Sequence, residues 1–250
     1  MYSLKEYLLE ALINHRNDDD NVVDFGLSVK WLKYNLAGNK LTDDESDYGY
    51  YYQWGSISSF SNATKHIFDW DTTPYCGGSR NSFTKYVINS KYSKYGTVDN
   101  KTTLEPMDDA VTALLGSKYR MPTKDEFKEL YNHCGGKHSG SLSGTTSVSS
   151  KGIYWVKSNS VIDGIKYKNP GCLFVGQNIT KRIFFPASGY YSHSSVEYAG
   201  SCCSYWSSSL VSSQSDLAHY LFFNSNYGFP AYNTDGSRYY GFSVRGVKVK

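Results

Sequence analysis

The chain has 250 residues, a net charge of +3 and 40% hydrophobic residues, with 24 Tyr, 12 Phe and 5 Trp. Its basic residues are scattered and form no run that would follow a phosphate backbone, so nucleic-acid binding is not expected. No apolar stretch approaches the roughly 20 residues of a membrane-spanning helix, so membrane insertion is not expected either. The composition predicts an aromatic core, and Tyr is also a residue that binding surfaces favour.

The cysteines and the first residues indicate where the chain is made. The 5 Cys are odd in number and lack CxxC spacing, which indicates neither a disulfide framework nor a zinc site. The N terminus lacks the cationic start, the apolar run and the small-residue cleavage site of a secretory signal. We therefore expect synthesis in the cytoplasm without a signal peptide.

The first 21 residues form a predicted docking helix followed by a polar linker. A capping-box pattern and hydrophobic residues at helical spacing predict one short amphipathic helix. Residues 14–21 are polar throughout and separate this helix from the rest of the chain. The helix either docks on a carrier or packs on its own domain, and the pattern leaves both open. Its docking face consists of Leu4, Tyr7, Leu8 and Leu12.

Strand signals come first in the remaining chain. Residues 22–36 alternate in hydrophobicity and are broken at Gly26, which predicts a hairpin that opens the domain. Residues 48–55 are a second β-favouring block, rich in aromatic residues and containing glycines. Residues 56–103 are rich in Ser, Asn, Lys and Tyr without clear periodicity, so we expect long surface loops there.

Two helices are predicted near the middle of the chain. Asp109 can cap a short helix over residues 110–115, which Gly116 would end. Thr123 and Glu126 form a capping box for a longer helix over residues 124–133.

The second half of the chain is predicted to be rich in strands. Residues 137–151 are dominated by Ser, Gly and Thr, which predicts a flexible surface loop. Clusters of Gly, Asn and Ser separate the later strands and favour a twisted antiparallel sheet with long excursions. The predicted strands cover residues 153–156, 164–167, 182–185, 204–208, 218–224 and 242–247.

Seven sequence blocks follow one another after residue 22: Val23-Asp-Phe-Gly-Leu-Ser-Val-Lys-Trp31, Tyr48-Gly-Tyr-Tyr-Tyr-Gln-Trp-Gly55, Leu104-Glu-Pro-Met-Asp-Asp-Ala110, Tyr119-Arg-Met-Pro-Thr-Lys-Asp-Glu-Phe127, Ile183-Phe-Phe-Pro-Ala-Ser-Gly-Tyr190, Tyr205-Trp-Ser-Ser-Ser209 and Arg238-Tyr-Tyr-Gly-Phe-Ser-Val-Arg245. Together they resemble a domain family of Bacteroidetes and their phages. That family has a C-type-lectin-like fold and is related to formylglycine-generating enzymes and to phage variable proteins. The resemblance implies one α+β domain over residues 22–250, with two helices, twisted antiparallel sheets and long loops.

Most residues of these blocks are expected to be structural. Two arginines, Arg120 and Arg245, are expected to bind buried carbonyls or carboxylates. The core is expected to contain Trp31, Trp54, Trp206 and Phe242.

The chemistry of the related families is not expected in this chain. A formylglycine-generating enzyme would need a copper-binding cysteine pair, and adjacent Cys202 and Cys203 would point to opposite faces of a strand. A calcium-dependent sugar site would need a Glu-Pro-Asn or Gln-Pro-Asp loop, whereas Glu105-Pro-Met107 lacks the third ligand and lies too early. No zinc-protease histidine pair or nucleophile elbow is present. We predict no catalytic residue, no metal site and no cofactor.

Residues 212–236 carry the predicted ligand site. Small polar residues alternate there with aromatic and polar ones, which is the composition of adaptable binding loops, although an ordinary polar β-meander is the alternative. The resemblance to variable proteins also suggests diversification by a retroelement, which cannot produce Lys, Glu, Gln, Met, Trp or Pro; only Gln214 and Pro230 belong to that set. The predicted ligand-binding residues are His219, Tyr220, Tyr227, Phe229, Tyr232, Asn233 and Asp235.

These observations predict a non-enzymatic ligand-binding protein. With the resemblance, they suggest a phage virion protein made in the bacterial cytoplasm, which its N-terminal helix displays. The expected partners are a host-surface protein or glycan, other virion proteins and further copies of the chain as a homo-oligomer. A structural capsid or tail decoration protein is the alternative, and a formylglycine-generating-like enzyme is a remote one.

Overall fold

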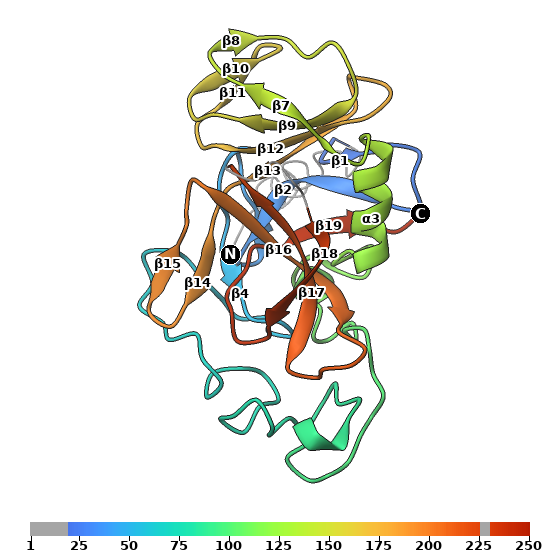
Figure 1. Ribbon diagram of the computed structural model, residues 1–250, viewed down its shortest axis with the longest axis vertical. Helices are drawn as coiled ribbons and strands as arrows, with labels where there is room; N and C mark the ends of the chain where they lie inside the picture. The colour runs from blue at the N-terminus through green and yellow to red at the C-terminus, as the bar shows by residue number, and fades with distance from the viewer. Residues whose placement is uncertain (1–19, 226–230) are drawn as a thin grey trace, which may run out of the picture.

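A computed structural model describes residues 20–225 and 231–250 (Figure 1). This part of the chain contains two α-helices, α2 (Ala110–Leu115) and α3 (Lys124–His133), among many short strands. The predicted α+β class is therefore confirmed, with strands predominating. The predicted docking residues Leu4, Tyr7, Leu8 and Leu12 lie outside the described residues, as does nearly all of the 1–21 segment.

The central sheet joins the two ends of the described chain. Its strand order is β1 (Val22–Val23), β2 (Lys30–Ala37), β19 (Arg245–Lys248) and β6 (Tyr119–Arg120). A short fifth strand, β3 (Lys40–Leu41), also pairs with β2. The strands β1 and β2 are antiparallel, which confirms the predicted opening hairpin. The final strand starts three residues later than predicted, because Phe242 and Ser243 form isolated bridges with other segments.

Both helices begin and end where their capping residues predict. The Asp109 side chain accepts hydrogen bonds from the backbone N–H groups of Val111 and Thr112. At α3, Thr123 and Glu126 form the complete capping box. The buried face of α3, which contains Phe127 and Leu130, packs into the main core. The helix thus covers one side of the molecule (Figure 1).

The prediction of a flexible loop over residues 137–151 was wrong. This segment contains β7 (His138–Leu142) and β8 (Thr145–Thr146). They pair in parallel with β9 (Gly152–Val156) and β10 (Ser160–Ile162). These sheets therefore contain both parallel and antiparallel pairs, whereas purely antiparallel sheets were expected. Ser and Gly have weak strand propensity, but hydrogen bonding to the edge of a well-formed strand orders them here.

A fully buried strand escaped the sequence prediction. All residues of β12 (Gly171–Val175) are buried, and it pairs with β9 on one side and β13 (Arg182–Pro186) on the other. A short apolar run buried on both faces shows no alternation, so periodicity does not reveal it. At Gly171 a Cβ atom would approach the Phe185 carbonyl oxygen to 2.3 Å, so the position requires glycine. With β8, β10 and β11 (Ile165–Tyr167), these strands form the upper end of the molecule in Figure 1.

The C-terminal half adds a three-stranded antiparallel sheet and a hairpin. The sheet runs β16 (Cys202–Leu210), β17 (Leu217–Asn224) and β18 (Ala231–Ser237). The hairpin of β14 (Tyr190–Ser192) and β15 (Ser195–Glu197) projects beside it (Figure 1).

The predicted core residues are buried. Arg245 donates to the carbonyl oxygens of Leu32, Lys33 and Phe184, which confirms its predicted role. Arg120 likewise fills its predicted role, because it donates to the carbonyl oxygen of buried Met121 and forms a two-pronged ion pair with the Glu126 carboxylate, at 2.7 and 2.5 Å. The predicted aromatic members of the core are all at most 2% exposed: Trp31, Trp54, Trp206 and Phe242.

Residues 56–103 form the long excursion at the lower end of Figure 1, largely without strands, as predicted. Only β5 (Ser59–Phe60), which pairs with β4 (Tyr51–Tyr52), and a single turn of 3-10 helix, η1 (Ser90–Tyr92), interrupt it.

Buried polar contacts attach this excursion to the body. Asp108 accepts hydrogen bonds from the hydroxyls of Tyr75 and Tyr86 and from the Lys85 ammonium. The buried guanidinium of Arg238 lies 4.1 Å from the centre of the Phe83 ring. The Asp108 contacts and the stacking of Arg238 on Phe83 therefore stabilise the excursion, although Nε and Nη2 of Arg238 have no hydrogen-bond partner among the described residues.

Candidate functional site

The alternation of β17 divides its side chains between the core and an open face. His219, Leu221 and Phe223 are buried on one side, whereas Tyr220 and Phe222 are half-buried on the other. Leu221 and Phe223 belong to the core cluster that α3 covers. Successive side chains of a strand point to opposite faces, so this short sequence both fills the core and presents aromatic rings.

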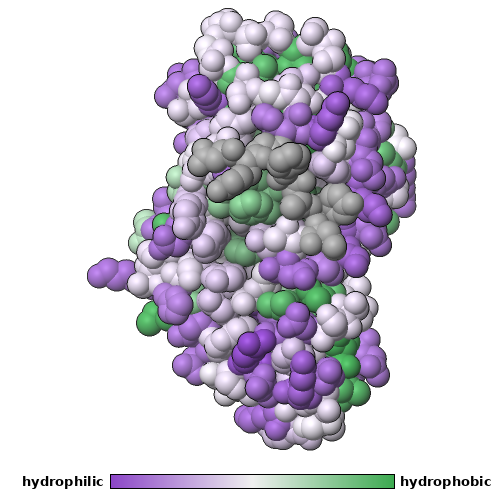
Figure 2. All heavy atoms as spheres, viewed as in Figure 1, coloured by the Kyte–Doolittle hydropathy of each residue, from purple (hydrophilic) through white to green (hydrophobic). Residues whose placement is uncertain are grey.

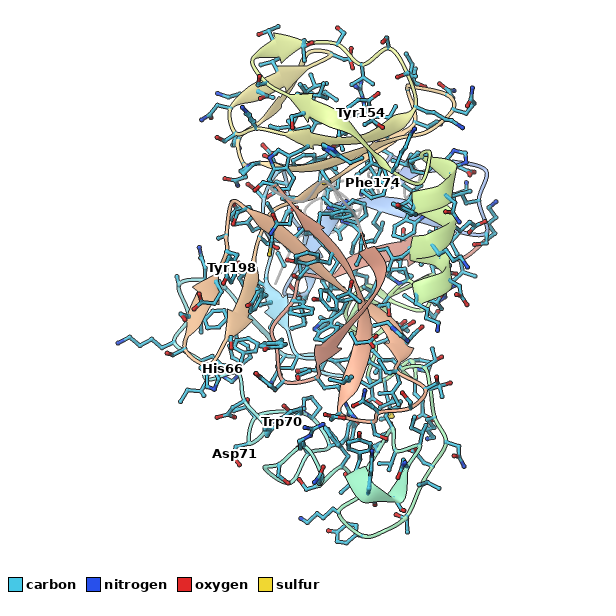
Figure 3. The ribbon with its side chains drawn as sticks, in the orientation of Figure 1. His66, Trp70, Asp71, Tyr154, Phe174 and Tyr198 are labelled. Carbon is cyan, nitrogen blue, oxygen red and sulfur yellow. The ribbon has the colours of Figure 1, made fainter. Side chains whose placement is uncertain are left out.

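The open face of β17 forms one wall of a cavity of about 440 Å³. Its other walls come from the β14–β15 hairpin, from β16 and β18, and from the segment that follows β18. Figure 3 labels Tyr198, which directly follows β15 and belongs to the hairpin wall. Figure 2 shows some hydrophobic side chains at the surface near the centre of the view. The lining residues are Tyr190, Tyr198, Cys202, Tyr220, Phe222, Asn224, Asp235, Gly236, Tyr240 and Phe242.

The aromatic rings of the cavity form a connected group. The rings of Tyr190 and Tyr198 are stacked, with centroids 5.8 Å apart. Tyr240 and Phe242 are nearly parallel at 5.7 Å, and Tyr190 meets Tyr240 edge-on at 5.4 Å. Tyr220 lies 4.6 Å from Phe242. Because each ring is held by another, the faces that line the cavity are positioned before a ligand arrives.

Three titratable groups of the cavity, Tyr190, Cys202 and Tyr220, are held in their neutral forms. Burial raises the pKa of the Tyr220 and Tyr190 hydroxyls, which keeps both phenols protonated at neutral pH. Burial also raises the pKa of the Cys202 thiol to about 11. No Lys, Arg or His is among the described residues that line the cavity. The walls therefore offer aromatic faces and neutral hydrogen-bonding groups.

Among the described lining residues, only Asp235 carries a carboxylate, and this group is directed to the other face of the sheet. Asp235 is the cross-strand partner of His219, and Oδ1 lies 2.8 Å from His219 Nδ1. The two atoms are close, but His219 Nδ1 has no hydrogen-bond partner among the described residues. Burial lowers the pKa of His219, although Asp235 opposes that shift. The imidazole is therefore neutral at pH 7.

The structure brings only part of the predicted ligand site together. Tyr220 and Asp235 line the cavity, whereas His219 is 6% exposed and faces the core side of the sheet. Tyr227 and Phe229 lie outside the described residues. The remaining two predicted residues, Tyr232 and Asn233, belong to β18, but their side chains are likewise outside the described part.

Sequence reasoning missed most of the cavity. Phe222 and Asn224 lay inside the predicted segment. The alternation of buried and half-buried residues along β17 assigns them to the open face of the strand, but the prediction did not use it. The remaining rings come from two tyrosine-rich segments outside it, which could have been recognised as further ring donors. Those rings are Tyr190, Tyr198, Tyr240 and Phe242.

Cys202 and Cys203 point in opposite directions, as predicted from their adjacency. Cys202 lines the cavity, and Cys203 is completely buried in the main core, where its thiol donates to the Phe185 carbonyl oxygen. Burial raises the pKa of both thiols, so neither is a ready thiolate.

Within residues 20–225 and 231–250, no three His, Cys, Asp or Glu side chains gather as metal ligands. In the same part of the chain no helix is long and apolar enough to cross a membrane. Neither a protein-family model, nor a curated protein, nor a solved structure matches the chain. The site must therefore be interpreted from its own geometry.

Proposed function

We propose that this chain is a non-enzymatic binding protein with a C-type-lectin-like fold, which recognises a neutral glycan through the aromatic cavity. The observation that carries the proposal is the lining of that cavity, which combines six aromatic rings with neutral polar groups. In keeping with the sequence resemblance, we place the protein on a phage particle and its ligand on the host surface.

The size of the cavity favours a small ligand or one projecting group. Ligand sites typically enclose about 300–1,000 Å³ and are lined by aromatic residues with a few polar groups. The cavity of about 440 Å³ lies within that range. A protein partner would instead require a broad interface of roughly 800 Å² on each side. A sugar residue on a longer glycan fits the observed shape better.

The chemistry of the walls favours a neutral sugar. Tyrosine rings offer flat apolar contact to the C–H face of a sugar ring, and their hydroxyls reach its O–H groups. The Tyr220 hydroxyl stays protonated, so it can both donate and accept a hydrogen bond. No basic side chain on the described lining would compensate an acidic sugar, whose charge would be costly to desolvate there.

A binding role also agrees with the reactivity of the polar groups. The Cys202 thiol has a pKa of about 11 and is a poor nucleophile at neutral pH. The Asp235 carboxylate is directed to His219 on the other face, away from a ligand in the cavity. No nucleophile and base are thereby held together against the ligand.

A glycan array with matched tyrosine variants tests this proposal. Tyr198 is 61% exposed on the cavity rim, and Tyr95 is 70% exposed on the distant excursion. We expect the wild type to bind a set of neutral glycans, and Tyr198→Ala to bind them about tenfold more weakly, or about 1.4 kcal/mol. Tyr95→Ala should bind like the wild type. Equal affinity of all three proteins, or no binding by the wild type, would refute the proposal.

The same pair of variants separates recognition from a structural role in the virion. Phage particles carrying Tyr198→Ala should assemble in normal yield and adsorb more slowly to host cells. A loss of particles with unchanged adsorption per particle would instead favour the capsid or tail decoration protein.

A further inference from the structure

A second, smaller cavity lies away from the aromatic one and shares no lining residue with it. Its volume is about 230 Å³. It lies between the opening hairpin, the loop that contains Glu45, strand β11 and the turn that leads into β13. Its polar lining includes Lys33, Glu45, Lys181 and Arg182. The cavity therefore presents both signs of charge at once.

Three of these charged groups have no direct partner. Within the described residues, Lys33, Lys181 and Glu45 form no side-chain hydrogen bond or ion pair. Arg182 differs, because its Nη1 atom lies 2.5 Å from Oδ2 of Asp163. Lys33 and Arg182 act on Glu45 through their charge alone. These opposite charges therefore line one cavity without forming ion pairs with one another.

A buried hydroxyl on β11, the strand that contributes Ile165 to the cavity, is also unsatisfied. Tyr167 is completely buried, and its hydroxyl has no hydrogen-bond partner among the described residues. Tyr167 lies two residues after Ile165 on β11, so both side chains leave the same face of that strand, and Ile165 lines the cavity. Burial and, after it, the charge of Glu45 raise the pKa of this phenol. Leaving such a hydroxyl without a partner costs about 1–3 kcal/mol.

We propose that this cavity binds the zwitterionic head of an α-amino acid. The ligand carboxylate lies between Lys33 and Lys181, with Arg182 beside them, and the ligand ammonium pairs with Glu45. The aliphatic walls that Val22, Val23 and Ile165 provide receive the carbon chain.

The balance of charge excludes simpler ligands. A simple anion would be attracted by the lysines but repelled by the unpaired Glu45 carboxylate. A simple cation would be attracted by Glu45 but repelled by Lys33 and Lys181. A zwitterion satisfies both sets, and removal of either half would leave desolvated charges unpaired. The cavity holds about eight times the liquid volume of a water molecule, which suits an amino acid of leucine size.

Calorimetric titration of the full chain with one amino acid and its two halves tests the proposal. The probes are L-leucine, 4-methylpentanoate, which lacks the ammonium, and isopentylamine, which lacks the carboxylate. We expect leucine to bind and each half to bind at least about tenfold more weakly. Diaminopimelate and a soluble cell-wall peptide that displays its zwitterionic end form a second arm. Tighter binding of the peptide than of leucine identifies the cell wall as the source, and the reverse identifies free amino acids.

Variants of the lining residues test whether the amino acid binds in this cavity. Glu45→Gln and Lys181→Met should each weaken binding of the amino acid about tenfold or more, while Lys157→Met, an exposed lysine outside the cavity, should leave it unchanged. Thermal melts confirm that each variant is folded. No binding of any zwitterion by the wild type, equal binding of the half-molecules, or unaltered binding by folded Glu45→Gln and Lys181→Met would overturn the proposal. Neutral-glycan binding at the aromatic cavity should be unaffected by these substitutions, so the two proposals can fail separately.

Discussion

The two faces of β17 contrast sharply although they alternate along one strand. Phe223 packs against Phe174 and Phe185 in the main core, with ring centroids 5.1 and 6.1 Å away. Its neighbour Phe222 is half-buried and lines the aromatic cavity. The same residue type in the same strand thus serves stability on one face and recognition on the other. Substitutions at adjacent positions should therefore separate the two roles.

The largest difference is expected between Phe223→Ala and Phe222→Ala. Truncation of a buried Phe in a close-packed core costs about 3–5 kcal/mol, so Phe223→Ala should lower the free energy of unfolding by that amount. Phe222→Ala should cost less than half as much, because its ring partly faces the open cavity. Urea denaturation of both variants measures the difference. Equal losses would contradict the division between the two faces.

Gly236 provides a smaller test on the cavity side. A Cβ atom there would lie 3.0 Å from Cε2 of Phe242 and 3.2 Å from Cη2 of Trp206. Gly236→Ala should therefore displace these rings and cost about 1–3 kcal/mol through overpacking. Because the rings support the cavity, glycan affinity should fall as well. Unchanged stability and unchanged affinity would show that the rings adapt freely.

The alkylation rates of the adjacent cysteines allow the two faces of β16 to be compared. The Cys202 thiol, with a pKa of about 11, should alkylate slowly at pH 8 and about tenfold faster at pH 9. Cys203 is completely buried and should react only after unfolding. Mass spectrometry of digests assigns the modified residue, and half-buried Cys76 serves as the internal reference. Alkylation of Cys203 in the folded protein would contradict the assigned orientation.

The smallest expected effect is a pH dependence from His219. Its folded pKa lies below the ordinary value of 6.5, so the unfolded chain takes up the proton first as the pH falls. Stability should therefore decrease as the pH falls below about 6.5, and this part of the loss should be absent in His219→Gln. Lys124 and Asp125 also act on the imidazole, in opposite directions, besides Asp235.

Melting temperatures at pH 7.5 and 5.5 for the wild type and His219→Gln measure this effect. His66 also has a lowered pKa and contributes a similar dependence, so it is the difference between the two proteins that counts. Identical pH dependence in both would show that His219 has no part in it.

Local signals in the sequence predicted the helices and the opening hairpin well. The capping box at Thr123 fixes α3 because all of its partners lie within four residues. By contrast, β7 forms only because β9 lies alongside it, and no local pattern in a Ser- and Gly-rich segment encodes that pairing. The strand β12 was hidden for a related reason, since it is buried on both faces.

The candidate site was predictable only in part because it is assembled across the sequence. Composition indicated residues 212–236, and Tyr220 and Asp235 of that segment reach the cavity. The opposing rings Tyr190 and Tyr198 come from a hairpin that only the tertiary fold brings alongside. Composition likewise could not place His219 on the core side, which depends on the register of β17 against β18.

Protection of Cys202 by a bound glycan would test the central claim most directly. Cys202 lies on the cavity wall, so its alkylation rate at pH 9 reports whether a ligand occupies that space. A saturating neutral glycan selected from the array should slow the reaction of Cys202 at least about fivefold and leave the rate of Cys76 unchanged. If the glycan binds and Cys202 still reacts at its original rate, the ligand lies elsewhere and the aromatic cavity is not the recognition site.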